Sequence, residues 1–410
     1  MSTKRKLWII FLLALALRLL WIATLDNTVD VWGDWWDELG WRLAQGHGFW
    51  VKNPYFPGYP DFYSWRSPGF PFFLSLIYRV SGHSLLAAKF GLAIMSSATA
   101  VLLYFLAAQL IDRKTGLLAG LLYAVYAPAV FWTGYLAPDN LFVPLLLLTT
   151  LCLVYAERQG EWTGFFLAGI FLGMGVLSRS LFLVVLPVGF VWLLVRQRRL
   201  AVPGTLLVLA GCLLIAGPWT FRNYRIHHRF VLTSTEGGIV CYIANNPNSL
   251  SEPSGYWNPP PEVLEQFKGL SEVEFDRALY RQAFAYIRSH PAEYGKLVRG
   301  RFIRFWRFYL HTFSGPGQAY SRKQALLSFF VLTPIFLLTF YGFYLSLKKW
   351  RGFFLFYLLI LGWSLPVILF FKTVIRYREA LMPCLLIFAA HALLTLLQRI
   401  NYNKTMGKAE

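Results

Sequence analysis

A series of long apolar stretches constrains this chain more than any other feature. The hydrocarbon core of a bilayer is roughly 30 Å thick, so a helix needs about 20 apolar residues to cross it. The stretches that meet or approach this length are residues 7–24, 86–111, 116–135, 141–156, 162–177, 181–196, 201–219, 325–347, 353–371 and 380–398. The sequence of 410 residues therefore predicts an all-α polytopic membrane protein with about ten transmembrane helices.

The composition excludes several other classes. The chain is 57% hydrophobic and only 14% charged, whereas a soluble domain has about 25% charged residues. Intrinsic disorder and nucleic-acid binding both need a polar chain, so neither is expected. Three of the four cysteines, Cys152, Cys212 and Cys384, lie inside apolar stretches, which argues against a disulfide framework or a metal-binding quartet.

The basic residues of the short loops set the orientation. With the N-terminus in the cytoplasm, one group of residues falls on the cytoplasmic side: Lys4, Arg5, Lys6, Arg113, Lys114, Arg196, Arg198, Arg199, Lys348, Lys349, Arg351, Arg399, Lys404 and Lys408. The positive-inside rule then predicts a multi-pass protein of the plasma or inner membrane with both termini in the cytoplasm. The N-terminal stretch also resembles a signal peptide, but nine further spans favour an uncleaved first helix.

Two long segments are left outside the membrane. Residues 25–67 and 220–323 exceed the length of ordinary connections, and such loops usually carry function or a fold of their own. We expect an N-terminal transmembrane module with a catalytic first outer loop (1–219), an extracytoplasmic segment with amphipathic helices (220–323), and C-terminal transmembrane helices with a cytoplasmic tail (324–410).

The first outer loop contains a short helix with grouped acids. Residues 34–44 have helical spacing, which predicts an amphipathic helix on the membrane surface. Its apolar stripe consists of Trp36, Leu39, Gly40 and Leu43. Asp34, Asp37 and Glu38 are spaced i, i+3 and i+4, so they should share one face, where repulsion between carboxylates can raise the pKa of one of them into a range suited to proton transfer. A compatible, simpler interpretation makes Asp34 an N-cap and Asp37 a first-turn acid.

Arg66 closes the first outer loop just before a further apolar helix at 71–80. At this depth an arginine can hold a lipid phosphate with two hydrogen bonds. The alternative is an ordinary interfacial anchor.

The second outer segment begins with a short β-like run and continues with helices. The run covers 237–247, and helices are expected at about 262–268, 271–289 and 291–311. Ser271 and Glu274 form a capping-box pattern. The last of these helices interleaves arginines with aromatic residues, which is typical of a helix that anchors on anionic lipid or gathers a phosphorylated lipid substrate.

Further charged residues converge on the outer face. Arg18 lies near the outer end of the first span, Asp139 and Arg179 lie in outer turns, and Arg376 and Arg378 precede the last span. Ionisable groups at membrane depth are candidates for function. The sequence therefore predicts one outer site that combines acids with phosphate-binding bases.

The residues also resemble a known family. The pattern consists of Gly33-Asp34 through Gly46-His47-Gly48-Phe49, Arg66-Ser67-Pro68-Gly69-Phe70-Pro71, Leu177-Ser178-Arg179, Gly237-Gly238 with Asn245-Asn246-Pro247, and Arg376-Tyr377-Arg378 with Met382-Pro383. In order and topology it is similar to the GT-C glycosyltransferases of the protein O-mannosyltransferase and lipid A aminoarabinose transferase type. The resemblance implies an enzyme that moves a sugar from a polyprenyl-phosphate carrier to an extracytoplasmic acceptor, either a protein, a lipid or a cell-envelope glycan.

The resemblance also implies roles for individual residues. Asp34 fits the place of the catalytic acid best, and Asp139 corresponds to an acid after the third span. Asp37 and Glu38 fit less well, because they lie too close to Gly46. The candidate catalytic residues are Asp34, Asp37, Glu38 and Asp139, and the candidate substrate-binding residues are Arg18, Arg66, Arg179, Arg376 and Arg378. The chain departs from the family at Trp36, where a tyrosine is common, and its outer segment is shorter than the large C-terminal domains of some members.

The chemistry of glycosyl transfer suits these residues. A carboxylate at Asp34 can act as general base on an acceptor, and attack opposite the phosphate would invert the anomeric centre. Arg66 with Arg376 or Arg378 would stabilise the departing phosphate. A divalent metal is compatible with the acids, although no His/Asp cluster requires one. The alternatives are a transporter or flippase of lipid-linked saccharides, which predicts more charge near mid-membrane, and a non-catalytic scaffold.

Overall fold

The computed structural model is helical, and it describes residues 2–29, 35–252, 257–308 and 321–406. The helices of the bundle are α1 (Thr3–Ala23), α4 (Leu85–Leu110), α5 (Arg113–Ala124), α6 (Ala127–Trp132), α7 (Asp139–Gln159), α8 (Trp162–Ser178), α9 (Val185–Arg196), α10 (Arg198–His227), α15 (Arg322–Ser346), α16 (Trp350–Phe370) and α17 (Met382–Met406). All of the predicted apolar stretches are helical. The stretch 116–135 is divided between α5 and α6, because Pro128 has no backbone N–H to continue α5.

The all-α polytopic architecture is confirmed. By length and composition, six segments of the described chain could cross a membrane, and one of them, Arg322–Phe370, contains both α15 and α16. Trp162–Ser178 and Ser180–Arg196 are shorter apolar helices. These criteria do not confirm the number ten, which stays a prediction. Many large apolar side chains of α1 and α10 are exposed, such as Leu20 and Leu214, as expected for helices that face lipid rather than water.

Shorter helices build the outer segments. They are α2 (Trp36–Gln45), α3 (Gly69–Ser81), α11 (Gly237–Tyr242), α12 (Pro261–Leu264), α13 (Glu272–Ser289) and α14 (Pro291–Trp306). Short 3-10 helices connect other elements: η1 (Ser180–Val184), η2 (Pro247–Leu250), η3 (Glu265–Phe267), η4 (Leu347–Lys349) and η5 (Ile375–Leu381). In the described chain, β pairing is limited to a single bridge between Val51 and Phe62.

Most local predictions for these segments hold. The capping box at the start of α13 is present, since Ser271 accepts from the backbone N–H of Glu274 and the Glu274 carboxylate accepts in return. The predicted β-like run at 237–247 is wrong, because it forms α11 and a turn. Gly238 packs so closely on α13 that an added Cβ would lie 2.1 Å from the backbone oxygen of Asp276. This packing outweighs the β preference of Ile239 and its neighbours.

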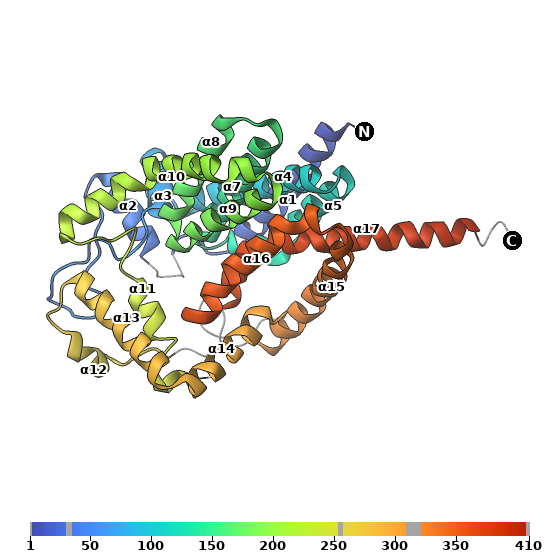
Figure 1. Ribbon diagram of the computed structural model, residues 1–410. Coiled ribbons are helices and arrows are strands. Elements are labelled where there is room, and N and C mark those ends of the chain that lie inside the picture. Colours follow the sequence, from blue (N-terminus) through green and yellow to red (C-terminus); the bar gives the residue numbers. More distant parts are fainter. Residues whose placement is uncertain (1, 30–34, 253–256, 309–320, 407–410) are drawn as a thin grey trace.

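The two outer segments pack together on a core of their own (Figure 1). Leu39, Phe62 and Trp65 of the first outer loop are buried in the same cluster as Ile239 and Phe275 of the second. The separate and larger core of the bundle contains side chains of α4, α7, α16 and α17. In Figure 1 the start of α1 and the projecting part of α17 lie at the same end of the bundle.

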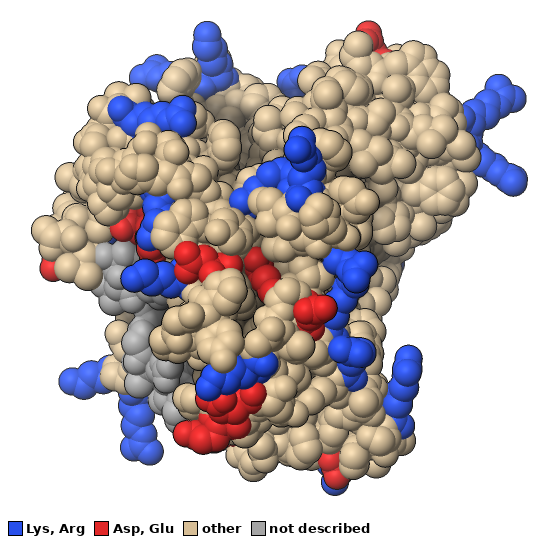
Figure 2. All heavy atoms as spheres, turned by 90° about the vertical axis from the view of Figure 1, so that its left-hand side faces the viewer, with Lys and Arg blue, Asp and Glu red and all other residues tan. Residues whose placement is uncertain are grey.

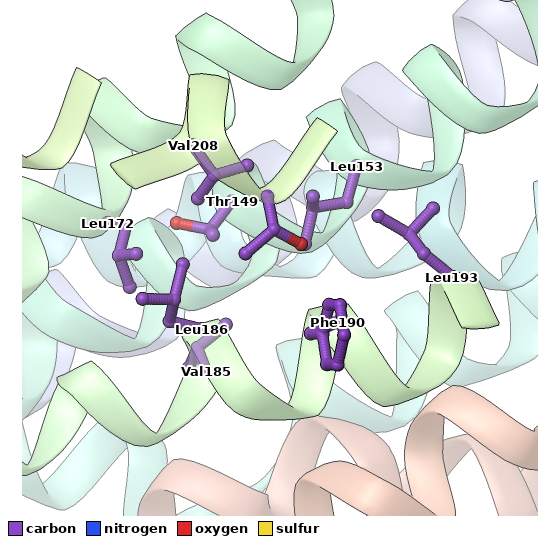
Figure 3. Close-up of a pocket in the computed structure, with 10 residues that line it drawn as sticks. Thr149, Leu153, Leu172, Val185, Leu186, Phe190, Leu193 and Val208 are labelled. Carbon is purple, nitrogen blue, oxygen red and sulfur yellow. The ribbon is translucent and has the colours of Figure 1, made fainter. Parts of the chain in front are cut away.

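The bundle is closely packed between α7, α8, α9 and α10. A cavity of about 10 Å³ lies there, and it is lined by mostly apolar side chains together with Thr149 and Thr205 (Figure 3). A void of this size holds at most about one water molecule. This part of the bundle therefore serves as a scaffold, and a site for a larger molecule has to lie elsewhere.

Candidate active site

Arg66 lies where the first outer loop returns to the bundle. Its guanidinium forms an ion pair with Glu236, the residue before α11. The guanidinium carbon lies 5.5 Å from the ring centroid of Trp35 and 5.1 Å from that of Trp36. The phenol of Tyr55 is close to this pair, and burial raises its pKa above the ordinary value. A carboxylate and aromatic faces thus fix the direction of the Arg66 fork.

Asp34, the predicted catalytic acid, lies outside the described residues. It directly precedes Trp35, whose indole ring lies beside Arg66. Trp35 has a φ of 61° and is the N-cap of α2 without a side-chain capping bond. A left-handed conformation is strained for a residue with a large side chain, and such strain often accompanies function. The chain therefore enters α2 through a sharp turn immediately after Asp34.

Three segments far apart in the sequence meet next to Arg66. The hydroxyl groups of Ser67 and Thr233 are 3.2 Å apart, and Thr233 also bonds to the hydroxyl group of Ser180. Gly69 packs on the end of α8, where an added Cβ would lie 2.6 Å from Oγ of Ser178. Only glycine permits this approach. The junction of Ser67, Thr233 and Ser180 brings together segments that the family resemblance marked separately.

Arg179 lies beside this junction. Its guanidinium carbon lies 5.2 Å from the ring centroid of Phe142 in α7 and 4.8 Å from that of Tyr377 in η5. The side chain is partly buried, and no acceptor among the described residues forms a hydrogen bond with its guanidinium. Because aromatic rings position the group while its N–H donors stay available, Arg179 is well placed to bind an anion.

Asp139 and Arg376 form a buried ion pair. Nε of Arg376 donates to Oδ2 of Asp139 at 2.6 Å, with 9% and 4% of the two side chains exposed. Oδ1 of Asp139 is buried and has no hydrogen-bond partner in the described chain. An unpaired buried acceptor costs about 1–3 kcal/mol, which a bound donor group would offset. Arg376 and Tyr377 are neighbours, so this pair lies next to Arg179.

The structure does not bring Asp37 and Glu38 into this cluster. Asp37 accepts from the hydroxyl group of Tyr78 at 2.5 Å and lies 2.9 Å from Nε2 of His83. Glu38 is exposed and forms an i, i+4 ion pair with Arg42 at 2.7 Å. Each of these two acids therefore has its own partner, and a face shared with Asp34 stays a prediction.

Arg18 and Arg378 are fully buried and hold helices together. Nε of Arg18 donates to Oγ of Ser96 at 2.8 Å, and Nη1 donates to the backbone oxygen of Ala124 at 3.0 Å. These bonds tie α1 to α4 and α5. Nη1 of Arg378 donates to the backbone oxygen of Phe305 at 3.1 Å, at the end of α14. Both guanidinium groups are thus used within the fold.

The sequence analysis missed Glu236, Thr233 and Ser180 as site residues. Two of them lie next to a marked residue, since Glu236 precedes Gly237 and Ser180 follows Arg179, whereas Thr233 lies four residues before Gly237. That adjacency was the available signal. Glu379, which follows Arg378 in the sequence, is also buried and accepts from the hydroxyl group of Tyr126 at 3.3 Å.

The outer segments contain an acid with a raised pKa and present a surface with both acidic and basic side chains. The backbone N–H of Gly238 donates to Oδ1 of Asp276 at 2.6 Å, and burial raises the pKa of Asp276 to about 7. Figure 2 shows the corresponding face of the molecule, where acidic side chains gather near the middle and basic side chains surround them. In the parts of the chain that the structure describes, no three His, Cys, Asp or Glu residues are grouped as metal ligands.

Comparisons with known proteins find similar sequences and a similar fold. The family model for dolichyl-phosphate-mannose-protein mannosyltransferase matches residues 65–221, which include Arg66, Asp139 and Arg179. The undecaprenyl phosphate-α-4-amino-4-deoxy-L-arabinose arabinosyl transferase of Pseudomonas aeruginosa (strain UCBPP-PA14) is 31% identical over 156 residues. This match covers 36% of the chain and 28% of that protein.

Solved structures share the fold. The oligosaccharyltransferase of Archaeoglobus fulgidus superposes with a TM-score of 0.62 at 14% identity, over 99% of this chain and 52% of that one. ArnT from Cupriavidus metallidurans, bound to undecaprenyl phosphate, has a TM-score of 0.56 at 15% identity, over 100% of this chain and 63% of that one. The chain thus spans from about half to two thirds of the length of these structures.

The fold and the matches together define a class. The chain has the architecture of the GT-C membrane glycosyltransferases, and the resemblance to the protein mannosyltransferase and aminoarabinose transferase type is confirmed.

Proposed function

We propose that the protein transfers a sugar from a polyprenyl-phosphate carrier to an acceptor on the extracytoplasmic side of the cell membrane. The names of the similar proteins support the donor, since one is an undecaprenyl phosphate-dependent arabinosyl transferase and others were solved with undecaprenyl phosphate or dolichol-phosphate. The extracytoplasmic placement rests on the distribution of Lys and Arg along the sequence.

The observation that carries the proposal is the available guanidinium of Arg179 next to the Asp139–Arg376 pair. A departing polyprenyl phosphate needs a cation with accessible N–H donors. Arg66 and Arg376 already pair with carboxylates. Among the predicted arginines, Arg179 therefore fits the phosphate best, and Arg376 adds positive charge beside it.

The reaction is a single displacement. Asp34 takes the proton from the acceptor hydroxyl or amine as that atom attacks the anomeric carbon. The bond from this carbon to the phosphate oxygen breaks, and the polyprenyl phosphate leaves with the bonding electrons. Attack from the opposite face inverts the anomeric centre. Arg179 stabilises the charge that develops on the leaving phosphate.

The test incubates purified protein with a panel of polyprenyl-phosphate sugars and acceptors and measures released polyprenyl phosphate. The wild type should release it, Asp34→Asn should lower kcat by about 10²–10⁴-fold, and Arg179→Gln should lower kcat/KM by about 10²–10³-fold. The control Glu265→Gln changes an exposed acid paired with Lys268 and should match the wild type.

If the Asp34→Asn variant transfers sugar at the wild-type rate, Asp34 is not the general base. A protein that moves lipid-linked sugars across vesicle membranes but releases no polyprenyl phosphate with any donor would be a transporter, and the proposal would fail.

A further inference from the structure

A polar pocket lies in the bundle away from the outer site. It has a volume of about 520 Å³ and is lined by residues of the α4–α5 turn, of η4 with the end of α15, and of α17. Its α17 residues, His391 to Gln398, follow Met382 by about 14–24 Å along the helix axis. Because α17 begins directly after η5, which holds Arg376, the outer site lies at the start of this helix and the pocket lies along its middle part.

Positive charge dominates the pocket. Its lining includes the cations Arg113, Lys114, Lys348 and Lys349, together with the imidazole of His391. Ion pairs to its arginine or lysines are absent from the part of the chain that the structure describes. The one acid in the lining, Asp112, accepts from the backbone N–H and the hydroxyl group of Thr115 at 2.8 and 2.7 Å. Four cations therefore share the lining with a single carboxylate, and this excess of positive charge favours an anionic ligand.

Exposed apolar side chains adjoin the basic pocket. Tyr344 and Leu347 next to it are 63% and 52% exposed, Trp350 is 42% exposed, and Leu397 and Ile400 of α17 are 47% and 50% exposed. Figure 1 shows α5, α15 and α17 meeting where the last part of α17 projects from the bundle. Aromatic residues beside lysines at the end of apolar helices are typical of the headgroup level of a bilayer.

We propose that this pocket binds the phosphate headgroup of an anionic phospholipid. The lysines and Arg113 contact the phosphate, and the acyl chains lie along the apolar surfaces of α15 and α17. A free phosphate would use the basic lining but would gain nothing from Leu397 and Ile400, so the apolar flanks favour a lipid. The site is separate from the proposed donor site and would hold a lipid that the enzyme does not consume.

The experiment measures the thermal unfolding midpoint of delipidated protein in detergent. Phosphatidylglycerol, phosphatidylcholine and inorganic phosphate are added separately. We expect phosphatidylglycerol to raise the midpoint by several degrees, as for any ligand of the folded state, and the other two additions to have less than half of this effect. In Lys348→Gln/Lys349→Gln the phosphatidylglycerol shift should fall at least twofold.

The matched control is Arg198→Gln/Arg199→Gln, which removes two exposed basic residues at the start of α10, outside the pocket. It should keep the full shift. If the double lysine variant unfolds without added lipid, Arg113→Gln replaces it. Equal shifts with phosphatidylcholine, equal shifts with inorganic phosphate, or an equal loss in the control would each overturn the proposal.

Discussion

At the scale of single residues, the partners of each arginine decide its role. The sequence treats the outer arginines as equivalent cations, but Arg66 pairs with Glu236, and Arg18 and Arg378 donate to groups within the fold. Arg179 lies on aromatic rings with its donors available. Geometry thus separates one candidate for phosphate binding from arginines that hold the protein together.

The buried pair of Asp139 and Arg376 gives a prediction of the same scale. Arg376→Met leaves a buried carboxylate without its cation and should lower the free energy of unfolding by about 3–5 kcal/mol. Adding Asp139→Asn should recover most of this loss, since no unpaired charge remains. Thermal unfolding in detergent measures both effects. If the double variant is no more stable than Arg376→Met, the pair does not act as a unit.

At the scale of elements, the contact of α11 with α13 depends on the protonation of one acid. The pKa of Asp276 is about 7, well above its ordinary value, because burial disfavours the carboxylate. The folded state therefore holds this proton more tightly than the unfolded state. The contribution of protonated Asp276 to the free energy of unfolding is fully present below about pH 4 and is lost as the pH rises through 7.

Asp276→Asn should remove this pH dependence. The amide oxygen can still accept from Gly238, and the variant should be more stable than the wild type at pH 8 by about 2 kcal/mol. The measurement is the unfolding midpoint of both proteins between pH 5 and 8. Parallel pH profiles would show that Asp276 does not titrate in this range.

At the scale of the whole molecule, one side chain joins the outer segments to the bundle. Arg301 of α14 is fully buried and donates to Oδ1 of Asn245 at 2.7 Å, after α11, and to the backbone oxygen of Leu369 at 2.7 Å, near the end of α16. Burial lowers its pKa to about 10, so it stays charged at neutral pH. Arg301 therefore connects three elements at one point.

Arg301→Gln should loosen the outer helices from the bundle. We expect faster amide hydrogen exchange in α11 and α14, by at least tenfold, with little change in α7 or α8, because the replaced bonds lie on the outer side. Arg299→Gln on the exposed face of α14 is the matched control. Equal exchange in the two variants would contradict the joining role.

By itself the sequence determined the helices and the class of protein. Apolar stretches of bilayer length and the capping box at Ser271 are local signals, so the positions of α1, α4, α13 and α17 follow from them. The sequence also predicts an outer site, because several acids and arginines lie in turns between the spans, and this site stays a prediction. The run at 237–247 was predicted wrongly, since contact with α13 rather than local preference decides its structure.

Only the tertiary structure decided which of these residues meet. Asp139 and Arg376 are far apart in the sequence, as are Ser67, Ser180 and Thr233, and no periodicity reports such contacts. Asp37 and Glu38 are adjacent in the same helix, yet they have different partners: Asp37 accepts from Tyr78, and Glu38 forms an ion pair with Arg42. Local sequence patterns indicate which face of an element contacts lipid or water and which hydrogen bonds form within that element. Whether a charged group can bind a ligand depends instead on every element packed around it.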